Sequence, residues 1–263
     1  MKEIDRLLWT MQTLRDPVDG CPWDREQTLK SILPYTLEEA YEVADAIERD
    51  DMDGLQEELG DLLFHICFYS QIASEQNIFD FRQLTEKITD KLQDRHPHVF
   101  AEGAVDSVAQ QSLDWERIKH AERKQRDAKA SLLDGINHAQ PAINQAYTLQ
   151  KRAATVGFDW NDPEDVFEKL EEEISELRQA LANGSDKEQI MGELGDILFT
   201  CVNLARHTDV NPESALRASN RKFEQRFRYI EQELASANKE LTDSSLNEME
   251  ALWQQVKNRE DNQ

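Results

Sequence analysis

The chain has 263 residues, with 53 Asp and Glu against 30 Lys and Arg, which gives a net charge of −23. This length suits one or two domains with ample material for a core. So acidic a chain lacks the basic surface that displaces counterions from phosphates, which argues against a general nucleic-acid binder and against an anionic membrane as partner.

Cysteine usage and hydropathy both indicate a cytoplasmic protein. The three cysteines, Cys21, Cys67 and Cys201, are odd in number and show no CxxC spacing, a pattern typical of reduced thiols packed in a core. No apolar run approaches the roughly 18 residues of a membrane span, and the N-terminus is amphipathic and acidic rather than a signal peptide. We therefore expect no membrane partner.

Apolar residues at helical spacing predict a series of helices in the first half of the chain. The first covers about 4–15 and is followed by a turn-rich loop over 16–24. Thr36, with Glu39 three residues later, matches a capping box, so we expect a helix from there to about Asp50. Further helices are predicted over about 55–73, 81–95 and 107–129.

The second half repeats this plan after a predicted linker over 131–140. A helix is expected from Pro141, followed by a loop over 156–160. Asp162 and Pro163 supply the N-cap and first-turn proline of the next helix. That helix is predicted to end at Asn183-Gly184, and later helices are expected to carry Glu193 with Asp196, to run over about 212–234, and to contain Trp253.

Landmarks recur at a nearly fixed offset, which indicates an internal duplication. Asp61 and Asp196 are 135 residues apart, KLQDR at 91–95 matches KFEQR at 222–226, and WERIK at 115–119 matches WQQVK at 253–257. No strand-like alternation of useful length occurs. We therefore predict an all-α fold of two tandem helical-bundle domains. Their predicted bounds are 1–130 and 141–263, joined by the linker 131–140.

Each half carries an acidic stretch of the form EExxE, followed further on by ExxD. Residues three or four apart share one face of a helix, so each stretch presents two carboxylate pairs. Two such helices packed antiparallel would bring four carboxylates together. The pairs are Glu39 with Glu42 and Glu58 with Asp61 in the first half, and Glu173 with Glu176 and Glu193 with Asp196 in the second.

Clustered carboxylates repel one another and need a cation among them. Oxygen ligands, without Cys or His at matching spacing, favour Mg²⁺, or Mn²⁺ in its place, over zinc. The alternative is a solvated helix face, which a single EExxE would be in so acidic a chain. The recurrence of the pattern, and the apolar runs that follow Asp61 and Asp196, favour a metal site.

Each half also carries a Lys and an Arg four residues apart, with a Trp further on. Such groups can neutralise phosphate charge and stack on a base, so the set matches a site that hydrolyses a nucleoside triphosphate. Alternative interpretations are a solvated face for the Lys–Arg pair and a core or interface position for the Trp. The residues are Lys222, Arg226 and Trp253 in the second half, and Lys91, Arg95 and Trp115 in the first.

Together with GCPWD at 20–24 and HPHVF at 96–100, these motifs resemble the two-domain form of the MazG-type nucleoside triphosphate pyrophosphohydrolases over essentially the whole chain. The resemblance implies an all-α, usually homodimeric, Mg²⁺-dependent hydrolase of acid anhydrides. Such an enzyme cleaves nucleoside triphosphates between the α- and β-phosphates to give a monophosphate and pyrophosphate. We expect broad base specificity and a role in nucleotide-pool house-cleaning.

The resemblance also implies roles for residues at the matching positions. Glu172 would orient or deprotonate the attacking water. Trp253 would contact the nucleotide, while Lys222 and Arg226 would bind its phosphates. The implied metal ligands are Glu173, Glu176, Glu193 and Asp196.

We expect the C-terminal site to be the main catalyst, because more cations surround it. Lys169, a predicted nucleotide-binding residue, stands three residues before the acidic pair, where the first half has Tyr35. Arg221 and Arg228 add charge beside the phosphate-binding segment. The N-terminal unit would then support folding and dimerisation, or bind nucleotide weakly.

Other hypotheses remain open. A related all-α dUTPase or phosphoribosyl-ATP pyrophosphatase would share the acids and differ in substrate. A non-catalytic acidic helical scaffold would not need a Lys and an Arg at matching positions in both halves.

Overall fold

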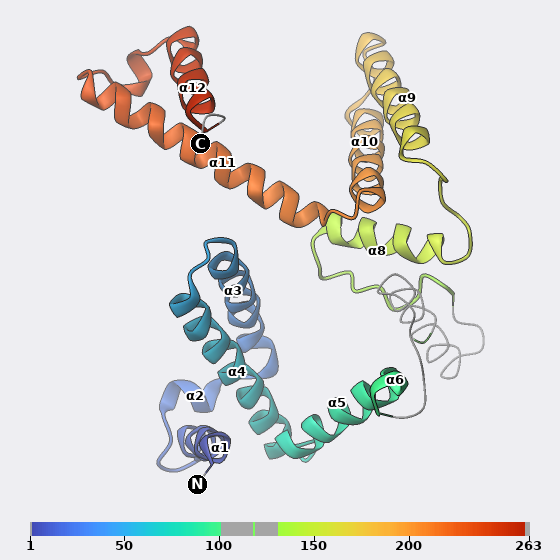
Figure 1. Ribbon diagram of the computed structural model, residues 1–263. Helices are drawn as coiled ribbons and strands as arrows, with labels where there is room; N and C mark the ends of the chain where they lie inside the picture. Colours follow the sequence, from blue (N-terminus) through green and yellow to red (C-terminus); the bar gives the residue numbers. More distant parts are fainter. Residues whose placement is uncertain (1, 101–117, 119–130, 261–263) are drawn as a thin grey trace. The chain divides into compact units, whose positions relative to one another are not determined.

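Every regular element in the described part of the chain is a helix, as the sequence predicted. The structure is a computed structural model that describes residues 2–100, 118 and 131–260. The chain divides into two units, Met1–Asp106 and Ser107–Gln263 (Figure 1). The predicted bounds of the domains stay a prediction, and the predicted helix over 107–129 lies almost wholly outside the described residues.

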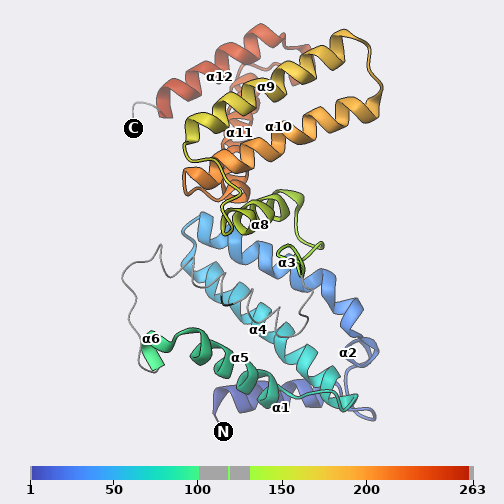
Figure 2. The same cartoon turned by 90° about the vertical axis from the view of Figure 1, so that its right-hand side faces the viewer.

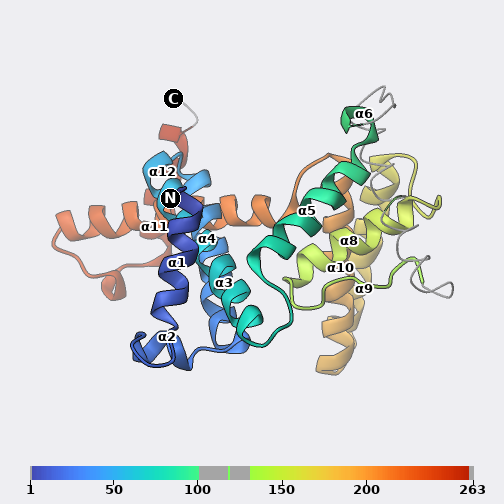
Figure 3. The ribbon, with the colours of Figure 1, turned by 90° about the horizontal axis from the view of Figure 1, so that it is seen from below.

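Unit 1 is built on a helical hairpin. Helix α3 packs along α4, and α1 and α5 each contact α4; Figure 3 shows α1 lying beside α4. The core contains Met11, Ile32, Phe68 and Ile72, all fully buried. The helices are α1 (Glu3–Leu14), α2 (Pro22–Glu26), α3 (Leu29–Glu48), α4 (Met52–Glu75), α5 (Phe81–Arg95) and α6 (Pro97–Phe100).

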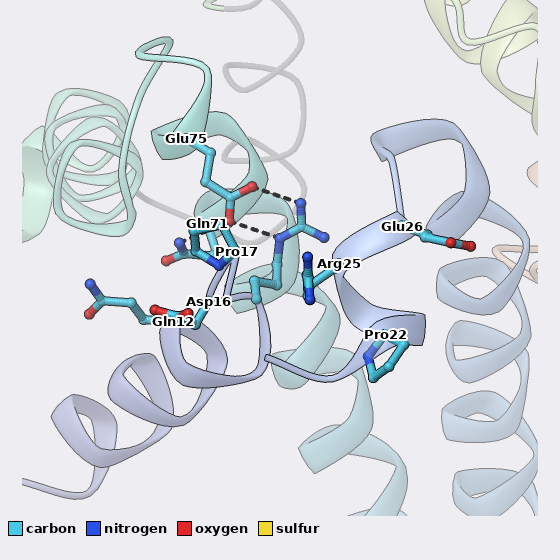
Figure 4. A pocket seen from close by; sticks show the side chains of 9 residues that line it. Gln12, Asp16, Pro17, Pro22, Arg25, Glu26, Gln71 and Glu75 are labelled. Carbon is cyan, nitrogen blue, oxygen red and sulfur yellow. Dashed lines mark hydrogen bonds and ion pairs between the residues drawn. The ribbon is translucent and has the colours of Figure 1, made fainter. Parts of the chain in front are cut away.

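Arg15, which follows α1, ties three elements of unit 1 together. Its guanidinium pairs with Glu75 at the end of α4 through two hydrogen bonds of 2.9 and 2.7 Å (Figure 4). It also donates to the carbonyls of Asp24 and Gln27 and lies 5.3 Å from the centre of the Phe68 ring. Paired donors in this planar fork fix both position and orientation, so α1 and α2 are held against α4.

The start predicted for the helix that carries the first EExxE is wrong. Helix α3 begins at Leu29, because Thr28 and Ser31 cap each other reciprocally. Thr36 lies inside the helix, and its hydroxyl bonds to Tyr69 at 2.7 Å. The predicted loop over 16–24 is also too long, since α2 already begins at Pro22.

Unit 2 contains two helical hairpins. Helices α9 and α10 run side by side, α8 packs on α10, and α11 packs with α12 (Figures 1 and 2). The predicted caps are confirmed, since Asp162 accepts from the Glu164 amide at 2.9 Å and Gly184 follows α9 at a φ of +66°. The elements are α8 (Ala142–Ala154), α9 (Pro163–Ala182), α10 (Lys187–His207), α11 (Pro212–Ser236), the 3₁₀ helix η1 (Leu241–Asp243) and α12 (Leu246–Glu260).

The segment over 131–140 has no helix, but it is packed against α8. Ile136 is buried, and the buried side chain of Arg152 donates to the carbonyls of Leu132 and Asp134 at 3.3 and 2.7 Å. None of the described helices combines the length and the apolar character needed to cross a membrane.

Candidate metal and nucleotide site

Three acidic side chains of unit 2 meet between α9 and α10. Glu173 comes from α9, and Glu193 and Asp196 come from α10, one turn apart on the same face. Each offers a carboxylate oxygen, and these oxygens lie within 4.8 Å of one another. Glu173 is only 5% exposed. The structure thus brings together three of the four residues predicted as metal ligands.

Glu176 and Glu172 lie on α9 beside this group without joining it. The pKa of Glu176 is raised by partial burial and by the charges of Glu173, Glu172 and Glu193, although Lys169 counteracts them. Glu172 is exposed and accepts an ion pair from Lys169 at 3.1 Å. Glu176 therefore lies in the negative field of the group, and Glu172 lies at its solvent edge.

Lys169 supplies the positive charge of the group. Its ammonium lies 2.6 Å from the Glu173 carboxylate, one turn away on α9. Hydrogen bonds to Glu173 and then Glu172 raise the pKa of Lys169, so it stays charged at neutral pH. An ammonium among carboxylates occupies the kind of place that a metal cation takes, and the donors are all oxygens, which suits a hard divalent ion.

Unit 1 repeats the group with Glu39 on α3 and Glu58 and Asp61 on α4, again within 4.8 Å of one another. Tyr35 stands where unit 2 has Lys169. Burial, then the negative charges of Glu42, Asp61 and Glu58, raise the pKa of Glu39 to about 7. Glu39 therefore binds a proton more readily than an isolated carboxyl does, whereas Glu173 of unit 2 has the Lys169 ammonium beside it.

The predicted phosphate- and base-binding residues of unit 2 lie on its other hairpin. Arg226 of α11 donates from Nε to Glu260 at 3.0 Å and lies 5.3 Å from the centre of the Trp253 ring. Trp253 of α12 also packs against Phe223. Lys222 is exposed on α11, and its charge helps to lower the pKa of Glu260, for which the hydrogen bond from Arg226 is the main cause.

The basic residues and Trp253 therefore form a second set on α11 and α12, a hairpin that is drawn apart from the α9–α10 hairpin in Figure 1. In unit 1 the corresponding Lys91 and Arg95 lie on α5, whose predicted end at Arg95 is confirmed. Trp115 lies outside the described residues.

The sequence analysis missed a polar set on α8, on α10 and in the loop between α8 and α9, in which Gln150 and Asn203 are buried. Arg206 forms a close ion pair with Asp159 and donates to Asn203 at 3.0 Å, and His207 lies 3.1 Å from Asp159. Gln150 of α8 donates to the Phe199 carbonyl at 2.8 Å. One signal was available in the sequence, because the polar Asn203 stands 135 residues after the apolar Phe68, at the offset that relates Asp61 to Asp196.

Comparison with known proteins is consistent with this geometry. The model of the MazG nucleotide pyrophosphohydrolase domain matches residues 27–100 and 161–230, one segment in each unit. The nucleoside triphosphate pyrophosphohydrolase of Escherichia coli (strain K12) is 50% identical over 264 residues, which cover 99% of each chain. The nucleoside triphosphate pyrophosphohydrolase/pyrophosphatase MazG of Thermotoga maritima is 40% identical over 97% of this chain and 95% of its own. The chain therefore belongs to the MazG family.

Proposed function

We propose that the protein is a nucleoside triphosphate pyrophosphohydrolase, which uses water to split its substrate into a nucleoside monophosphate and pyrophosphate. The observation that carries this proposal is the group of Glu173, Glu193 and Asp196, with the nearly buried Glu173 balanced by Lys169. Family membership and the names of the two relatives support it.

The acidic group is the proposed metal centre. Glu173, Glu176, Glu193 and Asp196 would hold Mg²⁺, for which Mn²⁺ could substitute, through oxygen ligands alone. When bound, such an ion neutralises phosphate charge and lowers the pKa of a coordinated water. Glu176 lies one turn from Glu173 on the same face of α9, and the charges of the group raise its pKa.

Glu172 is the proposed base for the attacking water. It is exposed beside the acidic group, so water reaches it freely. Lys169 bridges Glu172 and Glu173, and a phosphate oxygen that attracts this ammonium would release both carboxylates for their tasks. Lys169 would then act as a phosphate-binding residue, as the sequence predicted.

Lys222, Arg226 and Trp253 are proposed to bind the nucleotide from the α11–α12 hairpin. A guanidinium donates to phosphate oxygens in the geometry that Arg226 already uses toward the Glu260 carboxylate. Trp253 would contact the nucleotide through its ring. Arg226 would exchange one anionic partner for another on binding substrate.

A homodimer is the proposed assembly, because the α3–α4 hairpin of unit 1 and the α9–α10 hairpin of unit 2 each expose apolar side chains. Contiguous exposed apolar surface on a monomer marks an interaction site. A second copy that covers these faces could also bring its α11–α12 hairpin toward the acids. The exposed residues include Leu181, Met191, Leu194 and Leu198 in unit 2, and Leu33, Leu37, Leu59 and Leu63 in unit 1. The cytoplasmic location and the house-cleaning role stay predictions.

The decisive experiment incubates the purified chain with a panel of nucleoside triphosphates, dUTP and phosphoribosyl-ATP in Mg²⁺, and measures pyrophosphate and phosphate separately. We expect monophosphate and pyrophosphate from several triphosphates, and none in EDTA. Turnover of dUTP alone, or of phosphoribosyl-ATP alone, would assign one of the related activities. No turnover of any compound would favour the scaffold hypothesis.

A further inference from the structure

An ion pair between Arg226 and Glu260 joins α11 to α12 in unit 2, two helices that lie side by side in Figure 1. Arg226 donates to one oxygen of the Glu260 carboxylate from both Nε and Nη2, at 3.0 and 2.5 Å. Its guanidinium also lies 5.3 Å from the centre of the Trp253 ring, and the Arg226 side chain is only 12% exposed. A residue that we propose to bind substrate phosphate is therefore already held by an anion of the chain itself.

The Glu260 carboxylate lies in the field of both cations that we propose to bind phosphate. The hydrogen bond from Arg226 is the main cause that lowers the pKa of Glu260, and the charges of Arg226 and Lys222 act in the same direction, against the effect of partial burial. Carboxylate and phosphate oxygens accept hydrogen bonds from a guanidinium in the same geometry. Glu260 is thus a chemical analogue of the group that these cations are proposed to bind.

Local helix chemistry does not explain why a carboxylate stands at this position. Glu260 is the last residue of α12, and a negative charge is unfavourable at the C-terminal end of a helix. Glu248, in the first turn of the same helix, has the favourable placement and also accepts from the Ser245 amide at 2.9 Å. The Glu260 side chain remains 38% exposed, so it can leave Arg226 without disturbing a packed core.

We propose that Glu260 is an internal competitor that must release Arg226 before a triphosphate binds, an inference that rests on the proposed function. A phosphate oxygen would accept the hydrogen bonds from Nε and Nη2 of Arg226, and the Glu260 carboxylate would turn into solvent. The exchange weakens substrate binding and leaves the chemistry at the acidic group unchanged. Glu260 is therefore a positioning residue that acts through Arg226.

The test compares Glu260→Gln with the wild type in steady-state hydrolysis of ATP with Mg²⁺. Glutamine keeps the shape and an acceptor oxygen for Arg226 but removes the charge. KM should therefore fall roughly two- to fivefold, as for the loss of a partly exposed ion pair, while kcat stays the same. Glu248→Gln is the matched control, because it removes one negative charge from the same helix and one ion pair, that with Lys239 at 2.6 Å. It should leave KM unchanged.

A second measurement tests the competition without turnover. Binding of inorganic triphosphate is measured by isothermal titration calorimetry on the full chain in EDTA, and circular dichroism checks that each variant is folded. Glu260→Gln should tighten this binding by the same factor, and Glu248→Gln should not. In an Arg226→Gln background, Glu260→Gln should have no further effect, because the residue through which it acts is gone.

Three outcomes would overturn the proposal. An unchanged or higher KM in Glu260→Gln would mean that Glu260 is neutral or that it orients Arg226 for the substrate. Equal tightening in Glu260→Gln and Glu248→Gln would assign the effect to the net charge of the chain, and tightening that persists without Arg226 would assign it to another cation. If no triphosphate is hydrolysed but Glu260→Gln tightens the binding of inorganic triphosphate through Arg226, the proposed function fails and the competition stands.

Discussion

The acidic groups of the two units contain the same carboxylates and differ in what balances their charge. In unit 2 the ammonium of Lys169 lies 2.6 Å from Glu173. In unit 1 Tyr35 stands at that position, and burial with neighbouring carboxylates raises the pKa of Glu39 to about 7. A ligand set can therefore be duplicated intact while the chemistry around it diverges, and the counter-charge separates the two sites more clearly than the ligands do.

The largest expected effect comes from removing one ligand pair at a time. Glu193→Gln with Asp196→Asn should lower kcat by roughly 10²–10³-fold or more, because electrostatic stabilisation at the reacting phosphate is lost. Glu58→Gln with Asp61→Asn should keep most of the turnover. Steady-state kinetics with Mg²⁺ measures the turnover of each variant, and circular dichroism checks that both variants are folded. If the N-terminal variant loses the turnover and the C-terminal one keeps it, our assignment of the main site is wrong.

A smaller effect is expected when the internal cation of unit 2 is removed. Lys169→Met frees the Glu173 carboxylate from its ion pair, so Mn²⁺ should bind unit 2 more tightly without nucleotide, by roughly tenfold. Hydrolysis should nevertheless fall, because a phosphate-binding charge is lost. Calorimetric titration with Mn²⁺ and steady-state kinetics measure the two effects. Tyr35→Phe is the matched control in unit 1. Weaker Mn²⁺ binding in Lys169→Met would contradict the idea that the Lys169 ammonium competes with the metal ion for Glu173.

The raised pKa of Glu39 predicts that the stability of unit 1 depends on pH. The folded-state pKa of Glu39 is raised above its ordinary value of 4.5 to about 7. The folded form therefore holds its proton more tightly, and this stabilisation is full below 4.5 and is lost as the pH rises through about 7. In EDTA, thermal unfolding of unit 1 should occur a few degrees lower at about pH 8 than at about pH 5.

Glu39→Gln should flatten this dependence, and Glu38→Gln, its exposed neighbour, should retain it. An unchanged pH profile in Glu39→Gln would show that other groups govern the stability of the unit.

The smallest expected effect concerns the tie between α1 and α4. The hydrogen bond from Arg15 lowers the pKa of Glu75, so this contribution to stability is present above pH 4.5 and is lost as the pH falls through the lowered value. Glu75→Gln should lower the free energy of unfolding by roughly 1–2 kcal/mol at neutral pH, since Glu75 is partly exposed. Urea unfolding measures the change.

Glu86→Gln is the control for that comparison, because Glu86 pairs with Arg82 on the open face of α5. It should change stability little. Equal effects of the two substitutions would mean that Arg15 does not hold the helices together.

Local sequence signals predicted most of the fold, and they failed where one stretch offers two possible helix caps. Asp162 and Pro163 marked the start of α9 because capping uses adjacent residues. Thr36 with Glu39 carried the same kind of signal, but Thr28 and Ser31 cap the helix earlier and Pro34 is accommodated inside it. Two plausible caps in one stretch cannot be ranked by spacing alone.

The acidic groups could be predicted because a spacing of three places two acids on one face of α10 or α4, where the neighbouring helix of the hairpin adds one glutamate. The contact between Gln150 and Phe199 could not be predicted, because these residues are 49 apart in the sequence and only packing brings them together. The sequence shows Asn203 only as a polar residue within a predicted helix, and its burial is known only from the structure.

The hydrogen bonds from Arg152 to the carbonyls of Leu132 and Asp134 determine where a stable C-terminal fragment can begin. A fragment cut at Pro141 would discard those carbonyls and the buried Ile136, leaving a guanidinium in the interior without these acceptors. Protease cleavage within 131–140 should accordingly be slow while α8 is folded, even though the segment has no helix. A recombinant C-terminal fragment should begin no later than Ser131.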